Sequence, residues 1–237
     1  IESMQKTMKY LCENIQGCVL GYTQSDEITL ILIDYKKLNS SAWFDYEVQK
    51  MCSIAASMAT MAFNKFFKKN VENLEQYYAI EYETNGWYGK GTPEYEMCET
   101  YSKAVEKGAM FDARCFNIPK EEVTNLIYWR QLDASRNSIQ MVGQANFSHK
   151  ELQNKSCNQI QDMLIDKGIN WNDLPTHQKR GSCCVRNNIV ISTDGTTEIT
   201  QLRDSSESEN AWIIDKEIPI FKGEGREYID KLINVGE

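Results

Sequence analysis

Two adjacent acidic residues, Asp26 and Glu27, interrupt the otherwise apolar run CVLGYTQSDEITLILID at residues 18–34. A carboxylate pair at the end of a strand suits a hard cation such as Mg²⁺, which takes oxygen ligands and keeps several waters while bridging substrate phosphates. The alternative is that both acids are ordinary polar turn residues, because turns favour such side chains. Their spacing alone does not decide between a metal site and a simple turn.

The residues around this pair predict a β-hairpin with the acids at its tip. CVLGY and ITLILID are two runs with strand-like composition on either side of the short polar connection TQSDE. Upstream, apolar residues recur every three to four positions and predict one face of a helix over residues 1–15. Because the sequence opens inside this helix, we expect a further segment upstream of it. The residues of the apolar face are Met4, Met8, Leu11 and Ile15.

The rest of the pattern predicts a mixed α+β fold. Residues 43–69 predict a long, buried helix whose methionines fill the core, and residues 70–108 predict a loop or lid with short helices. FDARCFNI predicts a strand, and helices are expected after Pro119 through residue 139 and from Ser148 to Lys167, ending at Gly168. A hairpin about Asp194-Gly195 and a polar linker follow. We therefore expect an antiparallel sheet with helices packed on one face.

Composition limits the classes of function. The chain has 237 residues and a net charge of −8, which argues against non-specific coating of nucleic acid, since such binding depends on summed phosphate neutralisation. Six cations remain as a candidate local track for RNA. They are Lys65, Lys68, Lys69, Lys179, Arg180 and Arg186.

The expected compartment is the cytoplasm. We find no apolar run long enough to cross a bilayer and no secretory leader, so the eight cysteines are expected to be reduced thiols. With only two histidines and no CxxC pair, the sequence offers poor material for a zinc site.

Several segments, in the same order, resemble the tRNA-His guanylyltransferase family and its broader guanylyltransferase-like branch. They are YTQSDEITLIL at 22–32, Trp43-Phe44 with Lys50 and the following helix, FDAR at 111–114, YWRQLDASRNS at 128–138, and QKRG at 178–181. Together they cover most of residues 1–185. SDE alone is a weak signal, whereas SDE, FDAR and WRQ-D in this order form a fairly specific signature.

The resemblance implies a polymerase/cyclase-like palm domain over residues 1–185, with helical additions, and a C-terminal hairpin and tail over 186–237. It also implies addition of nucleotides to the 5′ end of tRNA in the 3′-to-5′ direction. In that reaction the 5′-monophosphate is activated with ATP or GTP, and the 3′-hydroxyl of an incoming GTP or other NTP then attacks the activated end. Two Mg²⁺ ions assist both phosphoryl-type transfers. A homotetramer without membrane association is expected.

The resemblance assigns roles to matching residues. Asp26 and Glu27 are the expected catalytic and metal-binding acids, and the nucleotide-binding residues have side chains suited to phosphate: a hydroxyl, a point charge and a forked cation. Those three residues are Ser25, Lys50 and Arg114. The expected RNA-binding residues are Arg130, Arg136, Lys179 and Arg180. Without the resemblance, Lys50 and Arg114 are ordinary surface cations, and Arg130 is equally able to pair with Asp133 along its helix.

Three departures from the family pattern shape the expected function. The family's upstream strand with an Asp-Gly pair, which supplies another metal-binding carboxylate, is not in this sequence. Glu47 stands where a triphosphate-binding arginine would align. In place of the eukaryotic histidine and paired asparagines after WRQ, which are associated with the tRNA-His anticodon, the chain has residues 134–138, ASRNS. We therefore favour template-dependent 5′-end repair over tRNA-His maturation.

Two alternatives belong to other classes. One is a non-catalytic RNA-binding protein that retains the palm scaffold, and the other is a nucleotide cyclase, since palm-like scaffolds also support cyclase chemistry. Extension of a truncated tRNA distinguishes all three, because only the polymerase lengthens the RNA.

Overall fold

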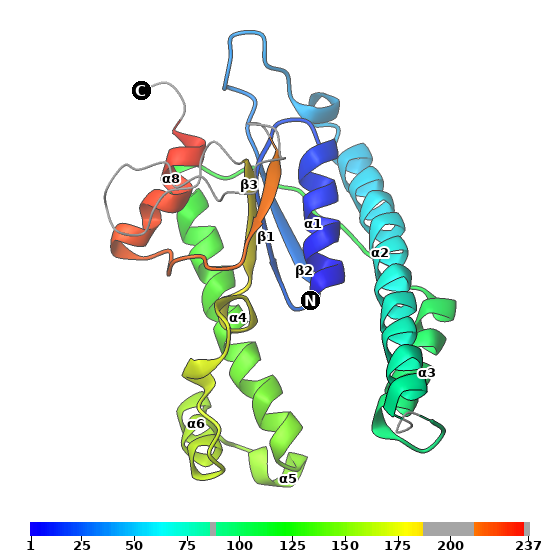
Figure 1. Cartoon of the computed structure of the whole chain (residues 1–237). Coiled ribbons are helices and arrows are strands. Elements are labelled where there is room, and N and C mark those ends of the chain that lie inside the picture. Colours follow the sequence, from blue (N-terminus) through cyan, green and yellow to red (C-terminus); the bar gives the residue numbers. More distant parts are fainter. Residues whose placement is uncertain (86–88, 187–210, 235–237) are drawn as a thin grey trace.

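A four-stranded antiparallel sheet in the order β2-β1-β3-β4 forms the centre of the protein (Figure 1). The strands are β1 (Cys18–Gln24), β2 (Glu27–Leu32), β3 (Ser182–Arg186) and β4 (Trp212–Asp215). The computed structural model describes residues 1–85, 89–186 and 211–234. The predicted hairpin at 18–34 is confirmed, since β1 pairs with β2 from Cys18↔Leu32 to Gln24↔Glu27. The hairpin predicted about Asp194-Gly195 lies outside the described residues.

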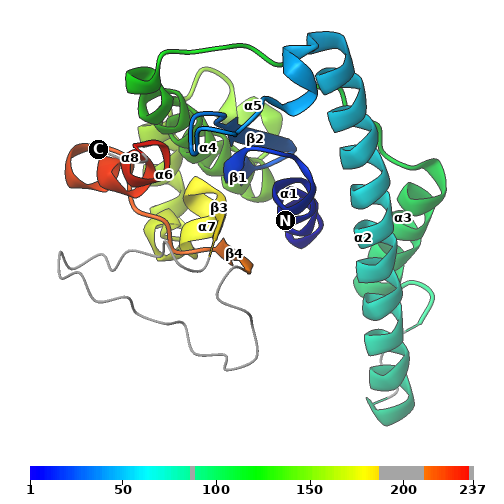
Figure 2. The same ribbon diagram turned by 90° about the horizontal axis from the view of Figure 1, so that it is seen from above.

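Helices cover both faces of the sheet, so the prediction that they pack on one face is wrong. All seven residues of β1 are buried, which requires cover on each side of that strand. On one face Tyr22 and Val185 pack with α4 (Val123–Asn146) and α8 (Glu227–Ile233). On the other, Cys18 and Cys184 pack against α1 (Glu2–Asn14), whose predicted apolar face is indeed buried. Figure 2 shows the sheet between these layers.

The long helix α2 (Val48–Asn85) is longer and far more exposed than the sequence predicts. It begins only at Val48 because Phe44, Asp45 and Tyr46, in a short 3₁₀ segment (Trp43–Tyr46), take left-handed φ angles. Ala59 packs against α1, but Met61 is 56% exposed. The prediction of a buried helix is therefore wrong: α2 runs antiparallel to α1 and extends past the sheet, where only one side is covered (Figures 1 and 2).

Two further predictions in this region are corrected. Residues 70–108 are mainly helical, because α2 continues to Asn85 and is followed by α3 (Pro93–Lys107). The signal for α3 was present in the sequence: the Thr92 side chain accepts a hydrogen bond from the Tyr95 amide, and Pro93 occupies the first turn. FDARCFNI forms no strand; this extended segment is held instead by side chains of α2.

The remaining elements surround the second half of α4. A 3₁₀ turn (Lys120–Glu122) precedes α4, as expected after Pro119. The helix predicted from Ser148 is capped as expected by Ser148 and Glu151, but it breaks into α5 (His149–Leu152) and α6 (Cys157–Asp166), because Ser156 and Gln159 form a second capping box. A 3₁₀ turn (Trp171–Asp173) and α7 (Thr176–Arg180) lead into β3, and another 3₁₀ turn (Gly223–Arg226) precedes α8. None of the described helices has the length and apolar character needed to cross a membrane.

Candidate active site at the hairpin tip

The β1–β2 tip presents its acids to solvent. Gln24 and Glu27 are paired in register, so Ser25 and Asp26 form a two-residue connection. Ser25 takes a left-handed φ of 48°, a conformation uncommon for a residue with a side chain. Ser25, Asp26 and Glu27 are all exposed, whereas the preceding strand residues are buried. The predicted catalytic pair therefore stands at the exposed end of a hairpin whose first strand is buried and whose second is mostly half-buried.

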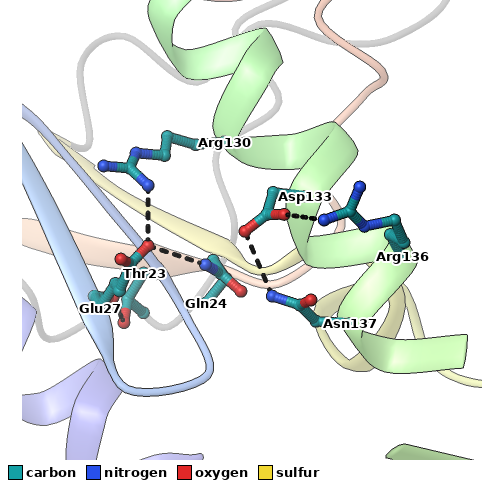
Figure 3. Close-up of polar contacts among 7 residues, drawn as sticks. All are labelled: Thr23, Gln24, Glu27, Arg130, Asp133, Arg136 and Asn137. Carbon is teal, nitrogen blue, oxygen red and sulfur yellow. Dashed lines mark hydrogen bonds and ion pairs between the residues drawn. The ribbon is translucent and has the colours of Figure 1, made fainter. Parts of the chain in front are cut away.

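Glu27 is fixed by two side chains (Figure 3). Its Oε2 atom accepts a hydrogen bond from Gln24 Nε2 at 3.1 Å and forms an ion pair with Arg130 Nη1 at 3.1 Å. The alternative pairing of Arg130 with Asp133 along the helix is not formed. Asp133 instead pairs with Arg136 at 3.6 Å and accepts a hydrogen bond from Asn137 at 3.2 Å. The predicted acid Glu27 and the predicted RNA-binding residue Arg130 thus belong to one cluster.

The three residues of the WRQ motif lie in three different environments. Trp129 is 75% exposed, a large aromatic surface directly beside the residue that binds the tip. Arg130 pairs with Glu27. Gln131 is buried, and its amide donates to the Pro219 carbonyl at 2.8 Å and accepts from the Phe221 amide at 3.0 Å. Sequence reasoning missed the roles of Gln24, which bonds Glu27 within the hairpin, and of Gln131, whose partners become its neighbours only in the fold.

The QKRG segment lies beside β1, just before β3 pairs with that strand. The Tyr22 hydroxyl donates to the Arg180 carbonyl at 2.6 Å, and burial raises the pKa of Tyr22 well above its ordinary value, so the hydroxyl remains a donor. Gly181 has a φ of 82°, and a Cβ there would lie 2.5 Å from the Thr23 carbonyl oxygen. Only glycine permits this close approach. Lys179 and Arg180 are consequently held near the hairpin that ends in the acidic tip.

A cavity of about 200 Å³ lies between the tip, α4 and α7. Its lining includes Ser25, Asn137, Met141 and His177. His177 Nδ1 is buried and has no hydrogen-bond partner among the described residues. Burial, with a contribution from Lys216, lowers the pKa of His177 below 6.5 and favours the neutral imidazole. Sequence reasoning had left both histidines without a role, and only the cavity gives His177 a distinct environment.

Two predicted nucleotide-binding residues lie away from the tip within one chain. Lys50 is near the start of α2, with its Nζ 4.6 Å from the centre of the Phe44 ring, and Arg114 pairs with Asp112 at 3.5 Å. Asn70, farther along α2, donates to Ser3 at the start of α1, close to the tip cavity that Ile1 helps to line. Lys50 precedes Asn70 by on the order of 30 Å of helix. Figure 1 likewise places the start of α2 and the hairpin tip at opposite ends of the sheet.

The tip has donors suited to magnesium, but few of them. Within the described ranges, no group of three or more His, Cys, Asp and Glu residues gathers to hold a metal ion. Mg²⁺ is commonly bound through one or two carboxylates, with waters and substrate phosphates completing its shell. Asp26, together with the part of Glu27 not engaged by Arg130, fits that arrangement. The residues therefore fit magnesium held jointly with a substrate and do not fit a closed protein cage.

The family model and the solved structures that match this chain all point to one family. The family model for tRNAHis guanylyltransferase (Thg1) matches residues 1–119. A bacterial tRNA(His) guanylyltransferase (Thg1)-like protein solved in complex with ATP is 35% identical, with a TM-score of 0.72 over 99% of this chain and 79% of that one. A bacterial protein of the same description in complex with GTP is 30% identical, with a TM-score of 0.62 over 98% of this chain and 76% of that one.

A curated viral relative is similar over a shorter stretch. It is the uncharacterized protein R259 of Acanthamoeba polyphaga mimivirus, 30% identical over 177 residues, which cover 70% of this chain and 54% of the relative. The chain thus spans about half the length of this relative.

Proposed function

This chain belongs to the tRNAHis guanylyltransferase family, and on that premise we propose that it adds nucleotides to the 5′ end of tRNA in the 3′-to-5′ direction. The observation that carries the proposal is the arrangement of three family segments around one site. The SDE tip belongs to the β1–β2 hairpin, and Arg130 of the WRQ motif and the QKRG segment, from distant parts of the sequence, both contact that hairpin. If the resemblance of these segments to the family were accidental, they would have little reason to meet at one place in the fold.

The proposed reaction has two steps. The tRNA 5′-monophosphate is activated by nucleotidyl transfer from ATP or GTP with loss of pyrophosphate, and the 3′-hydroxyl of the incoming NTP then displaces the activating nucleotide. Two Mg²⁺ ions would neutralise the charge that develops on the transferred phosphate in each step. Asp26 would hold magnesium, with Glu27 as the neighbouring acid of the site. The exposed Ser25 hydroxyl is suited to donate to a phosphate oxygen.

Glu27 also has a positioning role in this proposal. Because Arg130 and Gln24 both engage its Oε2 atom, the carboxylate cannot rotate freely, and the tip is fixed against α4. Preorganised groups contribute to catalysis because no reorganisation is needed when the reacting charge develops. The ion pair would therefore set the position of the tip relative to RNA bound along α4.

Lys50 and Arg114 are proposed as triphosphate contacts that act in an assembly. Their separation from the tip within one chain supports an arrangement in which one subunit supplies the tip and another supplies these cations. The half-exposed apolar side chains of α2, such as Ile54 and Met61, are suited to subunit contact. We accordingly propose that the chain assembles as a homotetramer. The proposed compartment is the cytoplasm. The palm description of residues 1–185 and the C-terminal hairpin and tail at 186–237 belong to the same proposal, with β4 of the tail completing the sheet and α8 packing in the core.

The proposed RNA surface lies beside the tip. Arg136, Lys179 and Arg180 supply cations, and Trp129 offers an exposed ring on which a base could stack. The ASRNS run at 134–138 lacks the histidine and paired asparagines expected of an enzyme that reads the tRNA-His anticodon. We therefore propose 5′-end repair of truncated tRNA as the principal activity and guanosine addition to tRNA-His as the secondary one.

The deciding experiment follows the length of the RNA. The natural full-length protein is incubated with Mg²⁺, NTPs and a tRNA that lacks its first nucleotide, labelled at its 3′ end. Template-matched growth at the 5′ end is expected, and Asp26→Ala should abolish it without lowering the melting temperature. Asp166→Ala, which removes an exposed acid on α6, is the matched control. Binding of tRNA without any growth would instead support a non-catalytic RNA-binding protein.

A further inference from the structure

An extended segment over residues 109–115, which we call the strap, lies along the first half of α2. At one end the Ala109 amide and carbonyl both bond the Asn64 side chain, at 2.8 and 2.9 Å. Next, the Phe111 amide donates to Thr60 Oγ1 at 3.1 Å. The bonding partners on α2 therefore move toward the helix start as the strap proceeds, so the two run antiparallel. Side chains of α2 replace the strand ladder that FDARCFNI would otherwise require.

The strap ends with a pair of thiols. Cys115 Sγ lies 3.7 Å from Cys52 Sγ, and it also lies 3.9 Å from the Val48 carbonyl oxygen. Both cysteines are only partly buried. Cys12, Cys18 and Cys184 also gather, but they are enclosed between α1 and the sheet. The Cys52–Cys115 pair thus combines close approach with access from solvent.

We propose that Cys52 and Cys115 are a redox modification site that closes to a reversible intramolecular disulfide on exchange with a small-molecule disulfide such as glutathione disulfide. The thiolate of one cysteine attacks the reagent, breaking its S–S bond, releasing one reduced thiol and leaving a mixed disulfide. The second cysteine loses its proton, attacks the protein sulfur of that mixed disulfide and releases the other thiol. The protein loses two electrons and two protons, and the reagent gains them.

The geometry requires little movement. A disulfide needs its sulfurs about 2.05 Å apart, so the strap end and α2 must approach by under 2 Å. The strap's backbone bonds to α2 lie at Ala109 and Phe111, so in the described structure no ladder bond holds the Cys115 end against this approach. Partial burial and the neighbouring thiol raise the pKa of Cys115, so less of it is thiolate at neutral pH and its attack on a disulfide is slower.

The modification would bear on the proposed function. Cys115 directly follows Arg114, and Cys52 is two residues from Lys50, so a disulfide would tie together the segments that carry both proposed triphosphate contacts. This consequence rests on the proposed function. The disulfide itself does not, because it is measured on the protein alone.

The test is a titration of the full chain with glutathione disulfide and glutathione, followed by alkylation and peptide mass spectrometry. We expect one Cys52–Cys115 cross-linked peptide, a loss of two hydrogen masses per chain, and full reversal by dithiothreitol. Amide hydrogen exchange over the strap should slow in the oxidised form. Cys157→Ser, which removes another partly buried thiol, should leave the cross-link intact, whereas Cys52→Ser should abolish it.

Two results would overturn the inference. One is accumulation of separate glutathionyl adducts on Cys52 and Cys115 without the cross-link. The other is cross-linking of either residue mainly to a different cysteine. Because the mapping is performed on the unsubstituted chain, it remains decisive if Cys52→Ser fails to fold. Failure of nucleotide addition by the reduced protein, when the same protein forms the cross-link on oxidation, would count against the proposed function alone.

Discussion

Glu27 and Arg130, which are 103 residues apart in sequence, form a 3.1 Å ion pair that joins the hairpin tip to α4. Their side chains are 47% and 42% exposed, so solvent screens the pair and its contribution to stability is below about 1 kcal/mol. Its effect should therefore be on the position of the tip. The neighbouring Gln131 differs from Arg130, because its side chain is buried and its two hydrogen bonds should contribute to stability.

Removing the Arg130–Glu27 pair should reduce activity with little loss of stability. Arg130→Ala and Glu27→Gln are each expected to slow nucleotide addition by on the order of 10- to 100-fold, because misplacement of a reacting group by about 1 Å has a cost of that size. The double variant should be no slower than the worse single variant. Single-turnover rates on truncated tRNA, with melting temperatures measured in parallel, provide the check.

The matched control for these variants is Arg226→Ala, which removes an arginine bonded to Asn125 in the first turn of α4. It should leave the rate of nucleotide addition unchanged. If the losses from Arg130→Ala and Glu27→Gln multiply in the double variant, the two residues act separately and the positioning role is wrong.

Replacing Gln131 should reduce stability. Gln131→Ala leaves the Pro219 carbonyl and the Phe221 amide without their partners. We expect a loss of about 2–3 kcal/mol in the free energy of unfolding, or roughly 4–12 °C in melting temperature. Gln140→Ala, at an exposed glutamine of the same helix, should change it little. Equal melting temperatures for both variants would show that Gln131 does not stabilise the C-terminal segment.

Mixing subunits should reveal whether Lys50 serves the tip of another chain. Asp26→Ala and Lys50→Ala proteins are each expected to be inactive in nucleotide addition, while co-expressed heteromers should recover a measurable fraction of the wild-type rate. The physical reason is that, within one chain, Asp26 at the tip and Lys50 near the start of α2 lie at opposite ends of the sheet (Figure 1). Lys36→Ala, at an exposed lysine between β2 and α2, replaces Lys50→Ala in the positive control, and those heteromers should be active. Heteromers that form but stay inactive would place both residues in the same chain's site.

His177 should make the folded state less stable under mildly acidic conditions. Burial lowers its pKa in the folded protein below 6.5, so the unfolded chain takes up a proton first and the free energy of unfolding falls as pH drops through 6.5. His177→Gln should reduce the fall in melting temperature between about pH 7.5 and about pH 5.5. Gln178→Ala, which alters the same cavity without removing a titrating group, should keep it. An unchanged pH dependence in His177→Gln would show that another group is responsible.

The sequence by itself determined the local elements near the tip. Apolar spacing identified α1, two runs of strand-like composition about a polar connection identified the β1–β2 hairpin, and a capping pattern located Ser148, because each of these signals acts between residues close in the chain. The WRQ and QKRG segments were likewise recognisable as a set. Local signals were also enough to indicate that Asp26 and Glu27 stand at a turn.

Only the tertiary structure decided how those elements meet. The two-sided cover of the sheet, the exposure of α2, the strap along it and the separation of Lys50 from the tip all depend on contacts between distant segments. Arg130 illustrates the reason: its helix offered Asp133 as a local partner, yet the fold brought Glu27 closer. Helical periodicity records which residues share a face, but it carries no information about which distant side chain will lie opposite.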